Sequence, residues 1–485
     1  MRRLLVGGAL LAVGLLTLGC SRDLGVEPAG MSDLDQLAAM ELNARVAAMR
    51  FVESAGWEKD PQAWAEATAA VAKSSTDTDW QCFFGASREV IVDDVVHYWM
   101  NVIVTTTGDQ IRLHRVVREI KPWEPIKTDD ALVLCHGDLK DFEGMFMPGQ
   151  FSPNLPDDFG FAVYLARNNV DVFGIDQAWN LVPAEQTDFS TFQDWGIERE
   201  MLNLSTACMG ARNIRYHTGQ GLDKILLLGY SSGAVTGYAL LNAQTQWAET
   251  NQSVRGFIAA DLGIKSDDPA CIESFMGYYN YYKSLYDAGQ YQDPLIFRDV
   301  ALRARTDPDG ESVYIPGLTN LQCALFFGGG EIFPPMTTHY HAPILADGLP
   351  VGFQYVTVDQ WLDFLENTAA YEPILFELEY CALLAGLDSP YDDHLAQVTM
   401  PVLDIGAAGG IGPYTAATVG YLGSTDVTQL YVSTNADPVL DYGHIDIFTG
   451  DNAEHLVWKP ILDWVRAHAA TRGGSSRAVA CMDTP

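Results

Sequence analysis

The segment Gly229-Tyr230-Ser231-Ser232-Gly233 places a serine between two glycines at the end of an apolar run, Ile-Leu-Leu-Leu. A helix-like pattern begins directly after the second glycine. In such a strand–turn–helix setting, G-x-S-x-G is the pattern of a serine nucleophile exposed on a sharp turn. The same residues also suit an ordinary tight turn, in which glycine supplies backbone freedom and serine caps the helix. The motif alone leaves both interpretations open.

Two histidines in the segment THYHAP, His339 and His341, are further candidates for chemistry. At positions i and i+2 they share one face of a strand and could ligate a metal ion. No carboxylate or cysteine stands at an obvious ligand spacing from them. We therefore expect these side chains in a substrate pocket or at the surface rather than around a metal.

The segments around the serine motif alternate between strand and helix patterns. A hairpin pattern around Thr107-Gly108-Asp109 comes first, because two β-rich runs flank this turn. The further apolar strand patterns are residues 131–137, 170–176, 224–230, 254–263, 400–409 and 428–434. Helical patterns separate most of them, which predicts a parallel sheet covered by helices and ligands at the carboxyl ends of its strands.

Residues 264–398 have a different texture and interrupt this alternation. One helical stripe there is rich in large side chains: Phe275, Met276, Tyr278, Tyr279, Tyr281, Tyr282 and Tyr286. This helix is either an ordinary buried helix or one whose surface partly lines an acyl pocket and favours bulky apolar acids.

The order of these elements resembles the α/β-hydrolase superfamily over roughly residues 90–470. The points of resemblance are the hairpin, the turn Cys-His-Gly-Asp-Leu (135–139), the serine motif, the insertion and a histidine before the last helix. The resemblance implies an α/β-hydrolase fold, a mostly parallel sheet flanked by helices, with a large, mainly helical cap after the sixth strand. It also implies that Ser231 is a nucleophile, as in serine esterases and lipases, because related dehalogenases and epoxide hydrolases carry aspartate there.

The same resemblance implies roles for several residues around the serine. His444, in DYGHIDIF between the last strand and the last helix, stands where the superfamily has its catalytic base. The backbone N–H of Ser232 is expected to bind the oxyanion, together with that of Asp138 or, next, Leu139. His136 is expected to hold its loop rather than to catalyse.

The acid partner of His444 departs from the commonest pattern of the superfamily. The loop after the seventh strand, residues 406–412, contains no carboxylate. Some lipases of this fold take the acid from the end of the sixth strand, and here that strand leads into Asp261. We therefore favour Asp261 over Asp404, Asp441 and Asp446, which remain alternatives.

Composition and charge limit the possible functions. Apolar residues make up 48% of the chain and charged residues 19%, which is typical of a globular protein. A net charge of −34 argues against nucleic acid as a partner, because its phosphates would be repelled. No glycine-rich dinucleotide motif follows a first strand, and no cofactor is implied.

The N-terminus has the pattern of a targeting segment. Arg2 and Arg3 precede an apolar run that ends in Leu16-Thr17-Leu18-Gly19-Cys20, which resembles a bacterial lipobox. The resemblance implies an exported lipoprotein anchored to a membrane through Cys20. An ordinary secretory signal cleaved nearby is the alternative.

Seven cysteines remain after Cys20, and an odd number leaves at least one thiol free. Cys135 and Cys208 lie in apolar patterns and are expected to be buried thiols. One pair among Cys271, Cys323 and Cys381 could form a disulfide.

We expect a serine hydrolase that cleaves a carboxylic ester through an acyl-enzyme, with a small-molecule or lipid-like ester as substrate. An acyltransferase or amidase using the same triad, or an inactive domain that only binds a ligand, are the alternatives. The expected parts are a signal peptide (1–20), a tether and helical segment (21–89), the core (90–263 and 399–470), the cap (264–398) and a tail (471–485).

Overall fold

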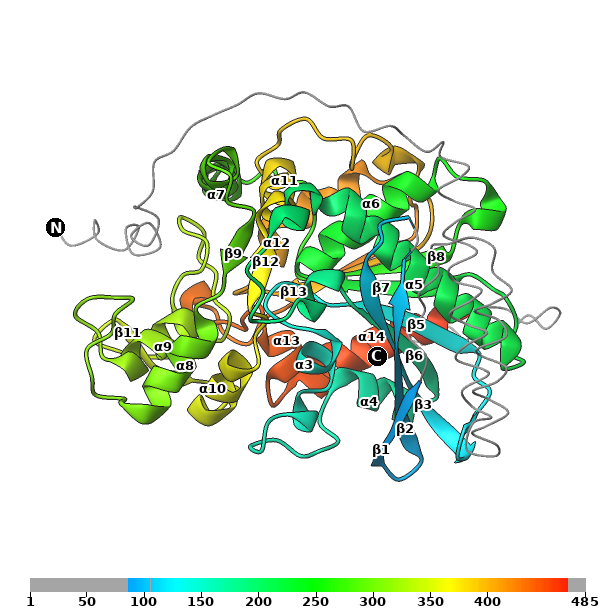
Figure 1. Ribbon diagram of the computed structural model, residues 1–485, viewed down its shortest axis with the longest axis horizontal. Helices are drawn as coiled ribbons and strands as arrows, with labels where there is room; N and C mark the ends of the chain where they lie inside the picture. The colour runs from blue at the N-terminus through cyan, green and yellow to red at the C-terminus, as the bar shows by residue number, and fades with distance from the viewer. Residues whose placement is uncertain (1–85, 105, 470–485) are drawn as a thin grey trace, which may run out of the picture.

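The computed structural model describes residues 86–104 and 106–469 of the chain, and a ten-stranded sheet runs through its centre (Figure 1). The spatial order is β1-β2-β3-β6-β5-β7-β8-β13-β14, with β4 paired to β3. The strands are β1 Ser87–Val92, β2 Val95–Ile103, β3 Gln110–Lys121, β4 Glu124–Pro125, β5 Asp130–Cys135, β6 Val170–Asp176, β7 Ile225–Tyr230, β8 Val254–Ala260, β13 Val402–Ala407 and β14 Val427–Val432. From β6 to β14 all neighbours are parallel, whereas β1, β2 and β3 pair antiparallel, as the hairpin pattern predicts.

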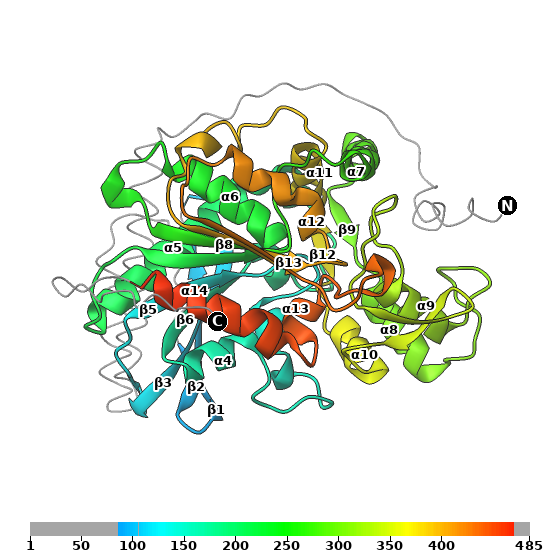
Figure 2. The same cartoon turned by 180° about the vertical axis from the view of Figure 1, so that it is seen from behind.

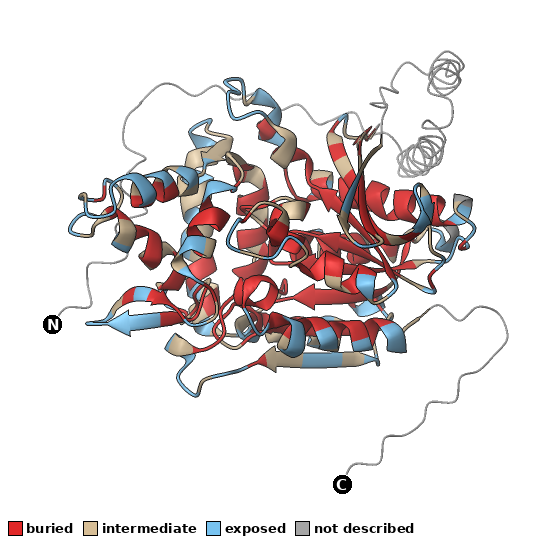
Figure 3. Cartoon of the chain, turned by 90° about the horizontal axis from the view of Figure 1, so that it is seen from below, coloured by how far each residue is buried: buried red, intermediate tan, exposed pale blue. Residues whose placement is uncertain are grey.

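The central strands are apolar on both faces because helices cover both faces. Alternate residues of a strand point to opposite sides of the sheet. In β5, Leu132 and Leu134 pack in one core with helices α4 and α14, whereas Val133 and Cys135 pack in the other with α5 and α6. These helices are α4 Phe161–Arg167, α5 Ile197–His217, α6 Ser232–Gln244 and α14 Lys459–Ala467 (Figures 1 and 2). The buried strands between them appear red in Figure 3.

The chain between β8 and β13 gathers on one side of the sheet, at the left of Figure 1. It contains α7 Pro269–Asp287, α8 Phe297–Thr306, α9 Asn320–Gly329, α10 Val358–Glu366, α11 Ile374–Leu384, β9 Gln292–Pro294, β10 Pro343–Ala346, β11 Leu349–Phe353 and β12 Tyr371–Pro373. The sequence patterns indicate α7, α10 and α11. The strands escape prediction because each has three to five residues, too few to show a period.

The cysteine predictions have mixed outcomes. Cys135 and Cys208 are buried free thiols, as predicted. The disulfide that the sequence allowed among Cys271, Cys323 and Cys381 is not formed, because all three are free. They lie on three different helices, α7, α9 and α11, and each is buried in the protein interior.

Several predictions lie outside the described residues: the signal segment with Cys20, the helical patterns before residue 74 and the tail from 471. In the part of the chain that the structure describes, no helix combines the length and apolar character needed to cross a bilayer.

Candidate active site

Ser231 sits on a sharp turn between β7 and α6. Its φ of 54° lies in the left-handed region, which is uncommon for a residue with a side chain. A side chain at Gly229 would collide with the carbonyl of Gly233, and one at Gly233 would collide with the loop at His136. The two glycines of the motif are therefore required by the close packing of this turn.

His444 joins Ser231 to Asp261. Its Nε2 lies 2.9 Å from the Ser231 Oγ, and its Nδ1 lies 2.6 Å from the Asp261 Oδ2. The ring of Tyr230 stacks on the imidazole at a centroid distance of 4.9 Å, and the Tyr230 hydroxyl donates to the His444 carbonyl. The ring of His444 is thus held in place from the strand that carries the serine.

The loop after β13 contains no carboxylate of its own. It binds the carboxylate of Asp261, the residue that follows β8. Asp261 is fully buried and accepts hydrogen bonds from the backbone N–H groups of Ala407, Ile411 and Gly412 at 2.8 to 3.1 Å. A side chain at Gly406 or Gly410 would collide with the same carboxylate. The glycines of this loop therefore make room for Asp261.

The three alternative acids are bound elsewhere. Asp404 accepts from Tyr431 and Gln429, and burial raises its pKa to about 6. Asp441 accepts from the backbone of residues 434 and 435, and Asp446 is paired with His341. None of the three contacts the ring of His444.

Two backbone N–H groups beside Ser231 have no hydrogen-bond partner among the described residues, those of Ser232 and Asp138. The side chain of Asp138 accepts from the Ser232 hydroxyl at 2.5 Å, which ties the two segments together. The alternative donor, Leu139, is excluded, because its N–H already donates to the Glu372 Oε1 at 2.7 Å. Sequence could not show this, since 233 positions separate the two residues.

His136 holds the loop that carries Asp138. Its Nδ1 donates to the carbonyl of Gly137 at 2.7 Å, and its Nε2 accepts from the backbone of Gln177 at 3.1 Å. Burial lowers the pKa of this imidazole. The ring does not contact Ser231, in agreement with a structural role.

His339 and His341 lie neither at the surface nor in the cavity beside Ser231, so that expectation is wrong. Both are buried. The Nε2 of His339 donates to the Asp441 carbonyl at 2.6 Å, and the Nδ1 of His341 lies 2.7 Å from Asp446. They connect the insertion to the loop of His444, a contact between segments that are distant in sequence.

Among the described residues, one group could offer three ligand atoms to a metal ion: His97, His114 and Glu143. The Nε2 of His97 lies 2.9 Å from the Nδ1 of His114, so these two ring nitrogens already share a hydrogen bond. The Nε2 of His114 lies 3.0 Å from Asp176, which accepts from the backbone of Phe142. We assign this buried chain to support of the loop beside the site.

No protein-family model matches the sequence, and no curated protein matches it. Among solved structures, a Sulfolobus solfataricus protein provisionally described as a lipase aligns with a TM-score of 0.54 and 18% identity, over 81% of this chain and 99% of that one. The chain has the α/β-hydrolase fold. A Thermogutta terrifontis esterase (TM-score 0.41, 13% identity, 77% of this chain and 99% of that one) and a Paleococcus ferrophilus monoacylglycerol lipase (0.37, 12%, 71% and 97%) are more distant.

In this α/β-hydrolase fold, a cavity of about 30 Å³ opens beside Ser231 and His444. Its other lining residues are Asp138, Leu139, Met145, Tyr230, Leu262, Phe275, Phe333, Tyr340, Phe364, Tyr380, Ile411 and Ile445. From the aromatic stripe of α7, Phe275 alone reaches the cavity. Tyr278 and Tyr286 instead donate to the carbonyls of Ile332 and Gln193, so this stripe mostly serves packing.

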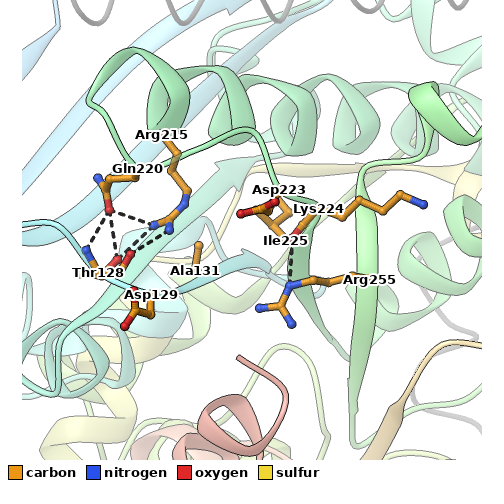
Figure 4. Close-up of a pocket in the computed structure, with 9 residues that line it drawn as sticks. All are labelled: Thr128, Asp129, Ala131, Arg215, Gln220, Asp223, Lys224, Ile225 and Arg255. Atoms are coloured by element: carbon orange, nitrogen blue, oxygen red, sulfur yellow. Dashed lines mark hydrogen bonds between the residues drawn. The ribbon is translucent and has the colours of Figure 1, made fainter. Parts of the chain in front are cut away.

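A second, smaller hollow of about 10 Å³ lies at the opposite ends of the central strands (Figure 4). Its lining includes Lys224 and Ile225, where β7 begins, whereas Ser231 follows the end of that strand. A six-residue strand is roughly 20 Å long, so this hollow is remote from the serine.

Proposed function

We propose that the protein is a serine hydrolase that cleaves a carboxylic ester through an acyl-enzyme. The observation that carries this proposal is the continuous chain from the Ser231 Oγ through His444 to a buried Asp261. A serine hydroxyl becomes an effective nucleophile when a base takes its proton and a third group orients that base.

The reaction follows from this geometry. The Ser231 Oγ attacks the ester carbonyl, and its proton passes to the Nε2 of His444. The N–H groups of Ser232 and Asp138 stabilise the negative oxygen of the tetrahedral intermediate. The intermediate then collapses and the ester bond breaks. His444 returns the proton to the departing alcohol. Water, deprotonated by His444, then attacks the acyl-enzyme. The bond from the acyl carbon to the Ser231 Oγ breaks, His444 returns the proton to that oxygen, and the acid leaves.

Labelling by a fluorophosphonate tests this proposal, because only an activated serine reacts with it. We expect the wild type to be labelled and to hydrolyse p-nitrophenyl esters, and Ser231→Ala to do neither. Loss of the nucleophile costs on the order of 10⁶ in kcat. A folded wild type that is neither labelled nor active would instead support an inactive ligand-binding domain. Transfer of the acyl group to an added alcohol or amine in preference to water would favour an acyltransferase.

We also propose that the chain is exported and anchored through Cys20. The support is the charged start, the apolar run and the lipobox-like end of residues 1–20. Cys20→Ala should shift the protein from the membrane fraction to the soluble fraction while its specific activity stays the same. A wild type that is already soluble after export would contradict the anchor.

A further inference from the structure

Four carboxylates gather beside and behind the cavity next to Ser231. Asp138 lines the cavity, and Glu372 accepts from the backbone of Leu139, which also lines it. Asp293, on β9, lies directly opposite Glu372 in the β9–β12 pair. Glu377 follows on α11 and is 3% exposed. We call these four residues the acidic cluster.

His444, which lines the same cavity, is the basic side chain that acts on Asp138. Within residues 86–104 and 106–469, no lysine or arginine forms an ion pair with any member of the acidic cluster. The nearby cations Lys140 and Arg298 donate instead to the carbonyls of Phe364 and Thr368. Glu372 and Asp293 lie directly opposite each other in the β9–β12 pair, so ionising both would place like charges side by side and destabilise this pair of strands.

One member of the cluster also leaves a buried oxygen without a partner. The Oε1 of Glu377 has no hydrogen bond. Glu377 and Tyr380 are three residues apart on α11 and therefore share one face of that helix. Since Tyr380 lines the cavity, this face is turned toward it. Tyr380 donates a hydrogen bond to the Glu377 carboxyl, so Oε1 is the atom left to accept from a positively charged donor.

The titration of the cluster agrees with a missing positive charge. Burial, followed by repulsion from Asp138, raises the pKa of both Glu372 and Glu377 well above its ordinary range. Burial also raises the pKa of Asp138 and of Asp293 to about 6. A bound cation would lower these values and keep the carboxylates ionised.

The walls of the cavity suit an organic cation better than a metal ion. No three members of the cluster bring oxygens close enough together to ligate one ion, in the part of the chain that the structure describes. The cavity walls carry the aromatic rings of Phe275, Phe333, Tyr340 and Tyr380. Aromatic faces attract ammonium groups by cation–π interaction.

We propose that the ester substrate carries a positively charged amine that enters this cavity and faces the acidic cluster. This inference rests on the proposed ester hydrolysis. It names a class of substrate, cationic esters, and assigns Asp138, Glu372 and Glu377 to the selection of that class.

Two matched pairs of esters test the inference. Acetylcholine and 3,3-dimethylbutyl acetate differ by a charged nitrogen in the alcohol part, and methyl 6-aminohexanoate and methyl heptanoate by one in the acyl part. We expect kcat/KM for the cationic member to be at least about ten times higher in one pair at low salt. Glu377→Gln should reduce that ratio several-fold, whereas the exposed Glu331→Gln should leave it unchanged. Glu372→Gln, whose amide oxygen can still accept from the backbone of Leu139, takes the place of Glu377→Gln if that variant does not fold.

Equal or faster hydrolysis of the neutral member in both pairs would overturn the inference and leave the proposed function intact. If the folded wild type hydrolyses no ester at all, the proposed function fails. Calorimetric titration with choline then still decides the cation site: binding that Glu377→Gln weakens supports it, and no binding rejects it.

Discussion

At the scale of single residues, Asp261 is the proposed acid of the site, and its Oδ2 lies 2.6 Å from the Nδ1 of His444. Replacing it by asparagine should leave the imidazole in the wrong tautomer and lower kcat by up to about 10⁴. Asp404→Asn is the matched control, because Asp404 is bound to Tyr431 and Gln429, and its kcat should stay within a few-fold of the wild type. A collapse in the Asp404 variant alone would show that this acid is wrongly assigned.

The sequence predicts Ser231, Asp261 and His444 as candidates for the site because each follows a recognisable strand or precedes a recognisable helix. It left the oxyanion donor open between Asp138 and Leu139. The bond that excludes Leu139 comes from Glu372, on a three-residue strand that carries no periodic signal. Periodicity is a local signal, so it does not predict contacts between irregular segments that are distant in sequence.

At the scale of elements, the loop that carries His444 is held by residues 339–342 of the insertion. The backbone N–H groups of His444 and Ile445 donate to the carbonyls of His339 and Tyr340, each at 2.9 Å. Asp446 accepts from His341 and from the backbone of Ala342 and Gly443. The insertion therefore positions the histidine as well as contributing to the cavity.

This contact predicts that His341 is a positioning residue. His341→Leu leaves Asp446 without its imidazole partner and should lower kcat by about 10² with little change in KM, since small displacements of a catalytic group cost that much. His341→Asn keeps a donor near the position of Nδ1 and should recover most of the rate. The exposed His455→Leu serves as the control. Equal losses in the leucine and asparagine variants, or a loss that only follows a lower Tm, would argue against positioning.

At the scale of the whole molecule, the excess of acids extends into the interior. The chain has 63 acidic and 29 basic side chains, and several of the acids, among them Glu200, Glu372 and Glu377, are buried. The strand and helix order was predictable because apolar periodicity is local. The placement of these buried acids was not, because it depends on contacts between segments that are distant in sequence, such as that of Glu372 with the backbone of Leu139.

The buried acids predict how stability changes with pH, and Glu200 on α5 is the clearest case. It accepts from the Trp195 indole at 2.6 Å, and burial, followed by repulsion from Asp109, raises its pKa to about 8. Its ordinary pKa is 4.5, so between about 4.5 and 8 the folded protein holds a proton that the unfolded chain has lost. Stability should therefore rise as pH falls from 8 to 6.5. Below that range three buried histidines oppose this gain in stability, because burial lowers their pKa values and the unfolded chain then binds more protons. They are His97, His136 and His339.

Urea unfolding of the wild type and Glu200→Gln at pH 6.5, 7.0 and 7.5 measures this contribution. Glutamine can still accept from Trp195 but does not titrate. The free energy of unfolding of the wild type should fall with rising pH by about 1.4 kcal/mol per pH unit more steeply than that of the variant. Glu331→Gln, at an exposed position, should follow the wild type. Parallel curves for the wild type and Glu200→Gln would mean that Glu200 is already ionised in the folded protein at neutral pH.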